Sequence, residues 1–288
     1  MITDSIVQAA RLIASADALH ITAGAGMGVD SGLPDFRGSK GFWEAYPALA
    51  RAGIEFRSIA NPAAFKDNPR LAWGFYGHRL ALYRNTVPHD GFRLLKLIAE
   101  KMPYGAFVTT SNVDGQFQKA GFEEARILEV HGSIHRLQCC EPCRDMVWSA
   151  ESIQPKTNDD RCEWVGDLPT CNKCRKLARP NILMFNDWVW MSSRTANQQA
   201  AMAIWAEKPS RRVVIELGAG VDIPTIRYTS QAQGCPVIRI NTRHPQLPEG
   251  MGVSLQMGAK DALRAIATEL RKIGWLNSAP ENDESERS

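Results

Sequence analysis

The sequence predicts an α/β fold in which a doubly wound parallel sheet carries a smaller domain formed by two insertions. The first observation is a series of short apolar runs that follow glycine, proline or polar residues, at residues 18–22, 105–109, 127–130, 212–217 and 236–240. Helix-like stretches separate most of these runs, and such alternation is typical of a parallel sheet. The second observation is that the first run ends in a glycine-rich loop. The third is that an aromatic-rich segment and a cysteine-containing segment interrupt the alternation.

The same pattern divides the chain into parts. We expect residues 1–40, 86–133 and 181–276 to form the larger sheet domain. Residues 41–85 and 134–180 are expected to pack together as a small helical and cysteine-containing domain, with a ligand cleft between the two domains. Residues 277–288 are polar and acidic, which predicts a disordered tail.

Composition narrows the class of protein. Hydrophobic residues make up 44% of the 288 residues and charged residues 23%, which is typical of a globular protein. A net charge of +3 is far from the concentrated basic character that direct nucleic-acid binding usually requires. No apolar run approaches the roughly 20 residues that span a bilayer, and the first residues lack a basic segment followed by an apolar one. We therefore expect a cytoplasmic protein with neither a membrane nor a nucleic acid as partner.

A glycine loop follows the first predicted strand. Residues 24–28 read Gly-Ala-Gly-Met-Gly, a backbone that can approach a pyrophosphate and offer its N–H groups. This signal alone is weak, because tight turns without ligands have similar sequences. Residues 31–38 strengthen it, since they place a carboxylate, an aromatic ring and a guanidinium in succession at Asp35, Phe36 and Arg37.

A second polar block follows the predicted strand at residues 105–109. Residues 110–121 include Asn112 and Asp114. An asparagine side chain both donates and accepts hydrogen bonds, and an aspartate accepts them, so the pair suits a carboxamide ligand. The alternative is that these residues cap a helix.

A histidine ends the next predicted strand. His131 follows residues 127–130 and would project toward the same edge of the sheet. An imidazole exchanges protons near neutral pH and could act as a base. A structural role is the alternative for a single histidine in this position.

Paired cysteines predict a structural zinc site. Cys171 and Cys174 form one C-x-x-C pair, and Cys143 forms the other half with either Cys139 or Cys140. The C-x-x-C spacing favours Cys140, and Cys162 is a possible substitute ligand. Four thiolates leave no open position on the metal, so zinc would have no catalytic role. Cys235 is expected in a strand, as a small core residue.

Taken in order, these motifs resemble the sirtuin family. Residues 24–38 resemble its G-A-G-x-S-x-x-S/A-G-I-P-D-F-R-G pattern, residues 110–121 its T-Q-N-I-D-x-L-H-x-x-A-G block, and residues 131–132 its H-G pair. Residues 179–187 resemble the R-P-x-V-V-x-F-G-E stretch. The resemblance covers about residues 18–270. It implies a Rossmann-like NAD-binding domain, a smaller zinc-containing domain, and NAD and structural Zn²⁺ as cofactors.

The resemblance also implies roles for individual residues. His131, Asn112 and Asp114 would be catalytic, with His131 as the base. The first zinc ligand of the family often lies eight residues after the histidine, which favours Cys139 with Cys143, Cys171 and Cys174. The residues implied to contact NAD are Gly24, Ala25, Gly26, Asp35, Phe36, Arg37, Ser111, Asn112, Asp114, His131, Gly218, Ala219, Gly220, Asn241 and Arg243.

Two segments are implied to bind the acylated substrate. Ile182, Leu183 and Phe185 would line an acyl-lysine tunnel. Tyr76 and Arg79 form a Tyr-x-x-Arg motif, which in sirtuins that remove succinyl, malonyl or glutaryl groups binds the acyl carboxylate. The alternative for this motif is an amphipathic helix whose aromatic residues face the core.

Several positions depart from the family pattern. Gly28 replaces serine, Ser111 replaces glutamine, Gln116 replaces leucine and Phe117 replaces histidine. Residues 186–187 read Asn-Asp in place of Gly-Glu.

The sequence therefore predicts an NAD-dependent protein lysine deacylase that acts on acylated proteins or peptides and produces free lysine, nicotinamide and O-acyl-ADP-ribose. One alternative is an enzyme that cleaves NAD and transfers ADP-ribose to protein or water. A second alternative, which is not an enzyme, is a sensor of NAD or ADP-ribose.

Overall fold

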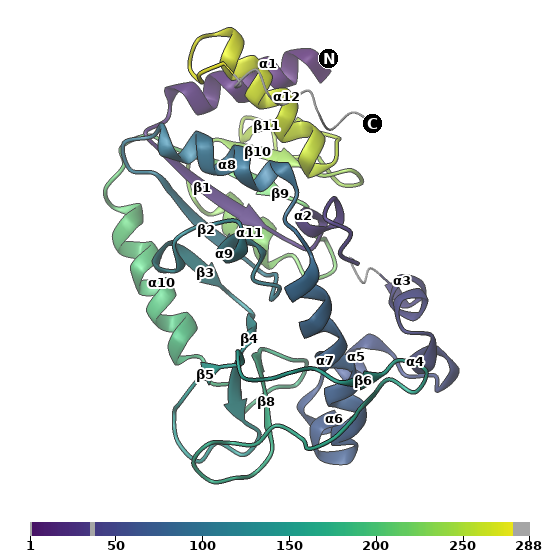
Figure 1. Cartoon of the computed structure of the whole chain (residues 1–288). Helices are drawn as coiled ribbons and strands as arrows, with labels where there is room; N and C mark the ends of the chain where they lie inside the picture. The colour runs from purple at the N-terminus through teal and green to yellow at the C-terminus, as the bar shows by residue number, and fades with distance from the viewer. Residues whose placement is uncertain (1, 35–37, 279–288) are drawn as a thin grey trace.

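The centre of the molecule is a six-stranded parallel sheet, seen in the computed structural model, which describes residues 2–34 and 38–278 (Figure 1). The strands lie in the order β3-β2-β1-β9-β10-β11. Their bounds are β1 Ala18–Ala23, β2 Ala106–Thr110, β3 Ile127–Glu129, β9 Arg212–Leu217, β10 Val237–Ile240 and β11 Gly252–Leu255. The chain runs outward from β1 to β3, returns to β9 beside β1, and runs outward again to β11. This order confirms the predicted doubly wound, Rossmann-like sheet.

Two details differ from the sequence prediction. The edge strand β11 was not predicted, because its four residues contain only two apolar side chains and begin with Gly252. The prediction that Cys235 lies in a strand was wrong. β10 begins at Val237, after Pro236, and the half-buried Cys235 belongs to the preceding loop.

Helices cover both faces of the sheet. α1 (Ile2–Ser15), α8 (Asp90–Glu100) and α12 (Ala259–Lys272) pack together on one face and form the largest hydrophobic core with the strands. α10 (Ser193–Ala206) and α11 (Thr225–Gln231) lie on the other face, where Trp205 contacts Phe107. Burial on both faces explains why the strands read as nearly unbroken apolar runs. Within the described ranges, no helix is both long enough and apolar enough to cross a membrane.

The two insertions form a second module with its own core (Figure 1). The first contributes α3 (Gly38–Ala45), α4 (Pro47–Arg51), α5 (Phe56–Ile59), α6 (Pro62–Asp67) and α7 (Pro69–Asn85). The second contributes a sheet of β5 (Trp148–Ser149), β4 (Gly132–Cys139) and β8 (Ala178–Ile182), and a pair of β6 (Thr157–Asn158) and β7 (Glu163–Trp164). Their shared core confirms that a smaller domain is built from two insertions.

Helix α7 joins the two insertions. It begins with Pro69 after Asn68, whose side chain accepts a hydrogen bond from the backbone N–H of Leu71. The indole Nε1 of the buried Trp73 donates to the carbonyl oxygen of Ala178 at 2.8 Å. A Cβ added to Gly74 would lie 2.0 Å from the carbonyl oxygen of Cys162, so only glycine permits this close packing.

Short helices complete the connections at the edge of the sheet. They are α2 (Gly26–Val29), α9 (Gln116–Lys119) and the 3₁₀-helix η1 (Glu124–Arg126). The Nζ of Lys119 in α9 donates to the carbonyl oxygens of Arg84 and Thr86, at the end of α7. These contacts fix the last turn of α7 against the loop that follows β2.

A buried ion pair joins neighbouring strands of the large sheet. Glu216 of β9 and Arg239 of β10 form two hydrogen bonds, of 2.6 Å from Nε to Oε1 and 2.9 Å from Nη2 to Oε2. Both side chains are almost fully buried. The Nη1 of Arg239 also donates to the carbonyl oxygen of Gln246 and so holds the loop after β10.

We predict that Glu216→Gln destabilises the fold by about 3 kcal/mol, because a buried guanidinium loses its carboxylate partner. Glu269→Gln is the matched control, since it removes a surface partner of Lys272 and should cost less than about 1 kcal/mol. Urea unfolding measures both free energies. Equal losses in the two variants would contradict the importance of the buried pair.

Candidate functional site

A cavity of about 670 Å³ opens at the carboxyl edge of the large sheet, where the small module faces it. Loops after β1, β2, β3, β8, β9 and β10 line it together with α7, which is the position at which doubly wound sheets bind ligands. It brings together most of the predicted site residues: Gly24, Ala25, Tyr76, Arg79, Ser111, Asn112, Asp114, His131, Ile182, Leu183, Phe185, Gly220 and Arg243.

Four other residues predicted to contact NAD lie outside the cavity lining. Gly26, Gly218, Ala219 and Asn241 are not among the cavity residues. The predicted loop residues Asp35, Phe36 and Arg37 lie outside the described ranges.

Two glycine loops form the floor of the cavity. A Cβ on Gly24 would lie 2.9 Å from the Cα of Ala219, and a Cβ on Gly218 would lie 2.4 Å from the Cα of Gly26. The backbone N–H of Gly26 donates to the carbonyl oxygen of Gly218 at 3.1 Å. Gly218 also has a φ of +59°. The loops after β1 and β9 therefore touch backbone to backbone, which explains why both are rich in small residues.

Asn241 organises the neighbouring loop after β10. Its Oδ1 accepts hydrogen bonds from the backbone N–H groups of Arg243 and His244, both at 3.0 Å. Its Nδ2 donates to the carbonyl oxygen of Ala219 at 2.9 Å. The buried amide thereby fixes the position of Arg243 relative to the glycine floor.

The loop after β2 supplies an amide and a carboxylate. The Nδ2 of Asn112 donates to the carbonyl oxygen of Gly24 at 3.0 Å, which ties this loop to the glycine floor. Asp114 is buried and its Oδ1 accepts a hydrogen bond from the backbone N–H of Gln116. Burial raises the pKa of Asp114 to about 6, although the hydrogen bond from Gln116 opposes this shift. Asp114 is thus mainly ionised at neutral pH and can accept hydrogen bonds from an amide.

His131 lies between β3 of the large sheet and β4 of the small module. Burial lowers the pKa of its imidazole below the usual 6.5, and a hydrogen bond with the backbone of Ser111 partly opposes the shift. A lowered pKa means that the ring is mainly neutral at pH 7, as a proton acceptor must be. The backbone N–H of Leu183 donates to the carbonyl oxygen of His131 at 2.9 Å, so the segment after β8 lies directly beside it.

The small module contributes one wall of the cavity. Tyr76, Arg79 and Tyr83 lie on one face of α7, at positions i, i+3 and i+7. The Nε and Nη2 of Arg79 both donate to the Tyr83 hydroxyl, at 3.0 and 2.6 Å. The sequence prediction missed Tyr83, although its spacing from Tyr76 placed it on the same face.

A buried ion pair shapes the segment after β8. Arg179 and Asp187 are almost fully buried, and Nη2 of Arg179 lies 2.8 Å from Oδ2 of Asp187. Asp187 also accepts hydrogen bonds from the backbone N–H groups of Met184 and Val189. The intervening Asn186 has a φ of +54°, which asparagine tolerates better than most residues. This turn presents Leu183 and Phe185 to the cavity.

The departures from the family pattern have different structural settings. A Cβ on Gly28 would lie 3.1 Å from Cδ1 of Leu33, so glycine leaves room for that side chain. Phe117 belongs to the core of the large domain, where its ring contacts Phe92 and Phe122. Ser111 lines the cavity itself.

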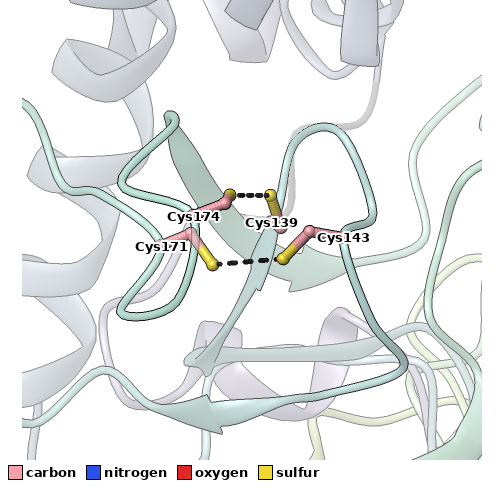
Figure 2. A group of neighbouring side chains, drawn as sticks. All are labelled: Cys139, Cys143, Cys171 and Cys174. Atoms are coloured by element: carbon pink, nitrogen blue, oxygen red, sulfur yellow. Dashed lines mark hydrogen bonds between the residues drawn. The ribbon is translucent and has the colours of Figure 1, made fainter.

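Four cysteines of the small module meet in one cluster (Figure 2). Cys139 ends β4, Cys143 follows in the next loop, and Cys171 and Cys174 lie on a turn before β8. The Sγ atoms are 3.6 Å apart for Cys139 and Cys174, and 3.7 Å apart for Cys143 and Cys171.

This geometry fits zinc. Tetrahedral zinc with bonds of about 2.3 Å to sulfur requires sulfur atoms roughly 3.8 Å apart. The cluster contains Cys139 and excludes Cys140, and the described cavity lining contains none of the four ligands. Cys162 is buried elsewhere, in the core beside α7. A metal here would hold two turns together and would not meet a ligand in the cavity.

The doubly wound sheet, the glycine floor and the polar cavity define a nucleotide-binding α/β protein that carries a four-cysteine zinc module. Residues 24–205 match the Sir2 family. The chain belongs to this family, whose members are the sirtuins that the motifs resemble.

Relatives and solved structures agree with this assignment. A Thermococcus kodakarensis protein named NAD-dependent protein deacylase is 31% identical over 273 residues, covering 92% of this chain and 95% of the relative. A Pyrococcus furiosus protein of the same name is 28% identical over 270 residues, covering 92% and 98%. The structure of a Sir2 homologue in complex with NAD has a TM-score of 0.67 at 21% identity, covers 92% of this chain and 93% of that one, and shares the fold.

We predict that Cys139→Ser loses bound zinc and lowers Tm by roughly 5 °C or more, because a structural metal contributes directly to folding stability. Cys140→Ser is the matched control and should retain about one zinc ion per chain. Elemental analysis and thermal unfolding measure both properties. Zinc loss from the Cys140 variant with retention in the Cys139 variant would show that the ligand assignment is wrong.

We also predict that His131 titrates below pH 6.5, because burial disfavours the charged imidazolium. Its neutral form should therefore dominate at pH 7 and give way to the charged form only as the solution becomes more acidic. NMR titration of histidine-labelled protein measures the midpoint, and the spectrum of His131→Gln identifies the resonance. A midpoint above 6.5 would contradict the effect of burial.

Proposed function

We propose that this protein is an NAD-dependent protein lysine deacylase that releases free lysine, nicotinamide and O-acyl-ADP-ribose. The observation that carries the proposal is the single cavity in which the glycine floor, Asn112, Asp114 and His131 meet the apolar segment after β8. Relatives that align over nearly the whole chain have the name of this activity. Its partners would be acylated proteins in the cytoplasm, with no nucleic acid required.

Each group in the cavity has a role in this reaction. NAD, when bound, supplies the ribose carbon that receives the acyl oxygen as nicotinamide leaves. The glycine floor at Gly24 and Ala25 offers backbone N–H groups to a diphosphate. Asn112 and Asp114 hold a carboxamide, and Ser111 and Arg243 complete the polar lining. Neutral His131 accepts a proton from a ribose hydroxyl, which turns that hydroxyl into a nucleophile.

The small module would select the acylated side chain. Ile182, Leu183 and Phe185 provide an apolar passage beside His131 that excludes water from the acyl group. Tyr76 and Arg79 lie on the wall of α7, where a guanidinium favours acyl chains that end in a carboxylate. We therefore favour succinyl or malonyl groups over acetyl. Zinc at Cys139, Cys143, Cys171 and Cys174 would take no chemical part.

We expect the enzyme to convert acetyl-lysine and succinyl-lysine peptides to free lysine and O-acyl-ADP-ribose in the presence of NAD. His131→Ala should slow the reaction at least about 100-fold, because the base is lost. Mass spectrometry detects both products, and reactions without NAD serve as the control. Consumption of NAD without lysine release would instead support ADP-ribose transfer or NAD hydrolysis, and tight NAD binding without turnover of any acyl peptide would support a sensor.

A further inference from the structure

Tyr83 is a buried phenol on the cavity wall for which the proposed reaction has no assigned role. It lies one helical turn after Arg79, and only 5% of its surface is exposed. Its backbone carbonyl oxygen accepts a hydrogen bond from Nε2 of Gln116, at the start of α9. The backbone of Tyr83 is therefore held by the large domain, while its side chain contacts Arg79 of the same helix.

The hydrogen bonds of Tyr83 determine what its hydroxyl can do. The phenolic oxygen accepts two hydrogen bonds from Arg79, from Nε at 3.0 Å and from Nη2 at 2.6 Å. With its oxygen used in this way, the hydroxyl has only its own hydrogen left for a further partner. Among residues 2–34 and 38–278, no acceptor for that hydrogen is found. A buried donor on a cavity wall is positioned to meet a ligand.

The surroundings make this hydroxyl a strong donor to an anion. Two N–H bonds from a cationic guanidinium polarise the O–H group that receives them. Burial raises the pKa of Tyr83, so the phenol keeps its proton at neutral pH. The charged side chains among the described lining residues are Arg79, Asp114, Asp222 and Arg243, and Arg79 is the one that contacts Tyr83.

We propose that Tyr83 is a specificity-determining residue for the acyl group, whose hydroxyl donates to the terminal carboxylate of an acidic acyl chain while Arg79 supplies the charge. The inference rests on the proposed deacylase function and adds a residue to its substrate site. Tyr83 orients the guanidinium of Arg79 by accepting its two hydrogen bonds. The positive charge of Arg79 polarises the O–H group of Tyr83, which makes that group a stronger donor to a carboxylate. A neutral acyl chain has no terminal acceptor for this hydrogen, so the contact discriminates between chains of equal length.

The test compares two peptides of identical sequence that carry succinyl-lysine or butyryl-lysine. Both acyl groups have four carbons, and only succinyl ends in a carboxylate. Tyr83→Phe should lower the ratio of kcat/KM for succinyl over butyryl by roughly 10- to 100-fold, the effect of one hydrogen bond to a charged group. Tyr104→Phe is the control, because Tyr104 is exposed and outside the cavity lining. It should leave the ratio at the wild-type value.

A second variant separates donation to the substrate from support of Arg79. Placing 3-fluorotyrosine at position 83 makes the phenol a stronger donor and a weaker acceptor. Direct donation lowers KM for the succinyl peptide, whereas a role limited to holding Arg79 raises it and overturns the proposal. An unchanged ratio in Tyr83→Phe, or wild-type preference for butyryl, also overturns it and leaves deacylation intact. If the wild-type enzyme releases lysine from neither peptide, the proposed function itself fails.

Discussion

The close packing of α7 against the second insertion is the constraint on which the small module and the cavity depend. Gly74 lets the helix approach the backbone of Cys162, and the indole of Trp73 donates to the carbonyl oxygen of Ala178. Neither insertion could bury its aromatic residues alone, since their core consists of side chains from both. The helix held in this way then presents its next turns to the cavity, where Tyr76, Arg79 and Tyr83 form one wall.

Burial shifts the pKa values of two titratable groups in the cavity, His131 and Asp114, in opposite directions. Burial disfavours the charged form of every titratable group, so it lowers the pKa of His131 and raises that of Asp114. The shift of His131 favours its neutral form near neutral pH, whereas the shift of Asp114 works against its ionised form and leaves that form in the majority only above a pH of about 6. The Asn112 side chain ties the loop after β2 to the glycine floor, and a backbone hydrogen bond ties His131 to the segment after β8. These contacts limit how far the two groups can move apart.

The strands and the zinc ligands could be predicted from the sequence because local patterns of residues indicate them. Apolar runs are short but nearly uninterrupted where a strand is buried on both faces, and five of the six strands of the large sheet could be predicted in this way. The edge strand β11 lacks such a run, and Cys235 was misplaced because Pro236 delays the start of β10. Spacing alone favoured Cys140 as the first zinc ligand, whereas the ordered resemblance to a family favoured Cys139, which is the cysteine in the cluster.

Site residues that act through tertiary contacts could not be predicted from motifs. Asn241 is predicted to contact NAD, and its side chain also bonds the backbone of Ala219 and of Arg243, which no motif indicates. Phe117 stands at a motif position and belongs to the core. Tyr83 lies outside the Tyr-x-x-Arg motif, and its importance depends on the direction in which Arg79 donates its hydrogen bonds. The directions of side-chain hydrogen bonds are fixed only when the two insertions and the sheet have packed together.

Strand β4 connects the four-cysteine cluster to the cavity. It begins at Gly132, immediately after His131, and ends at Cys139, the first cysteine of the cluster. A strand of at most roughly 26 Å, at about 3.3 Å per residue, therefore connects the cysteine cluster to His131. It pairs with β8 near both ends, with a shift of register between Ser133 and Leu137, and β8 leads directly into the segment of Leu183 and Phe185. Zinc bound by the four cysteines would therefore fix one end of the strand whose other end adjoins His131, although the metal lies outside the cavity.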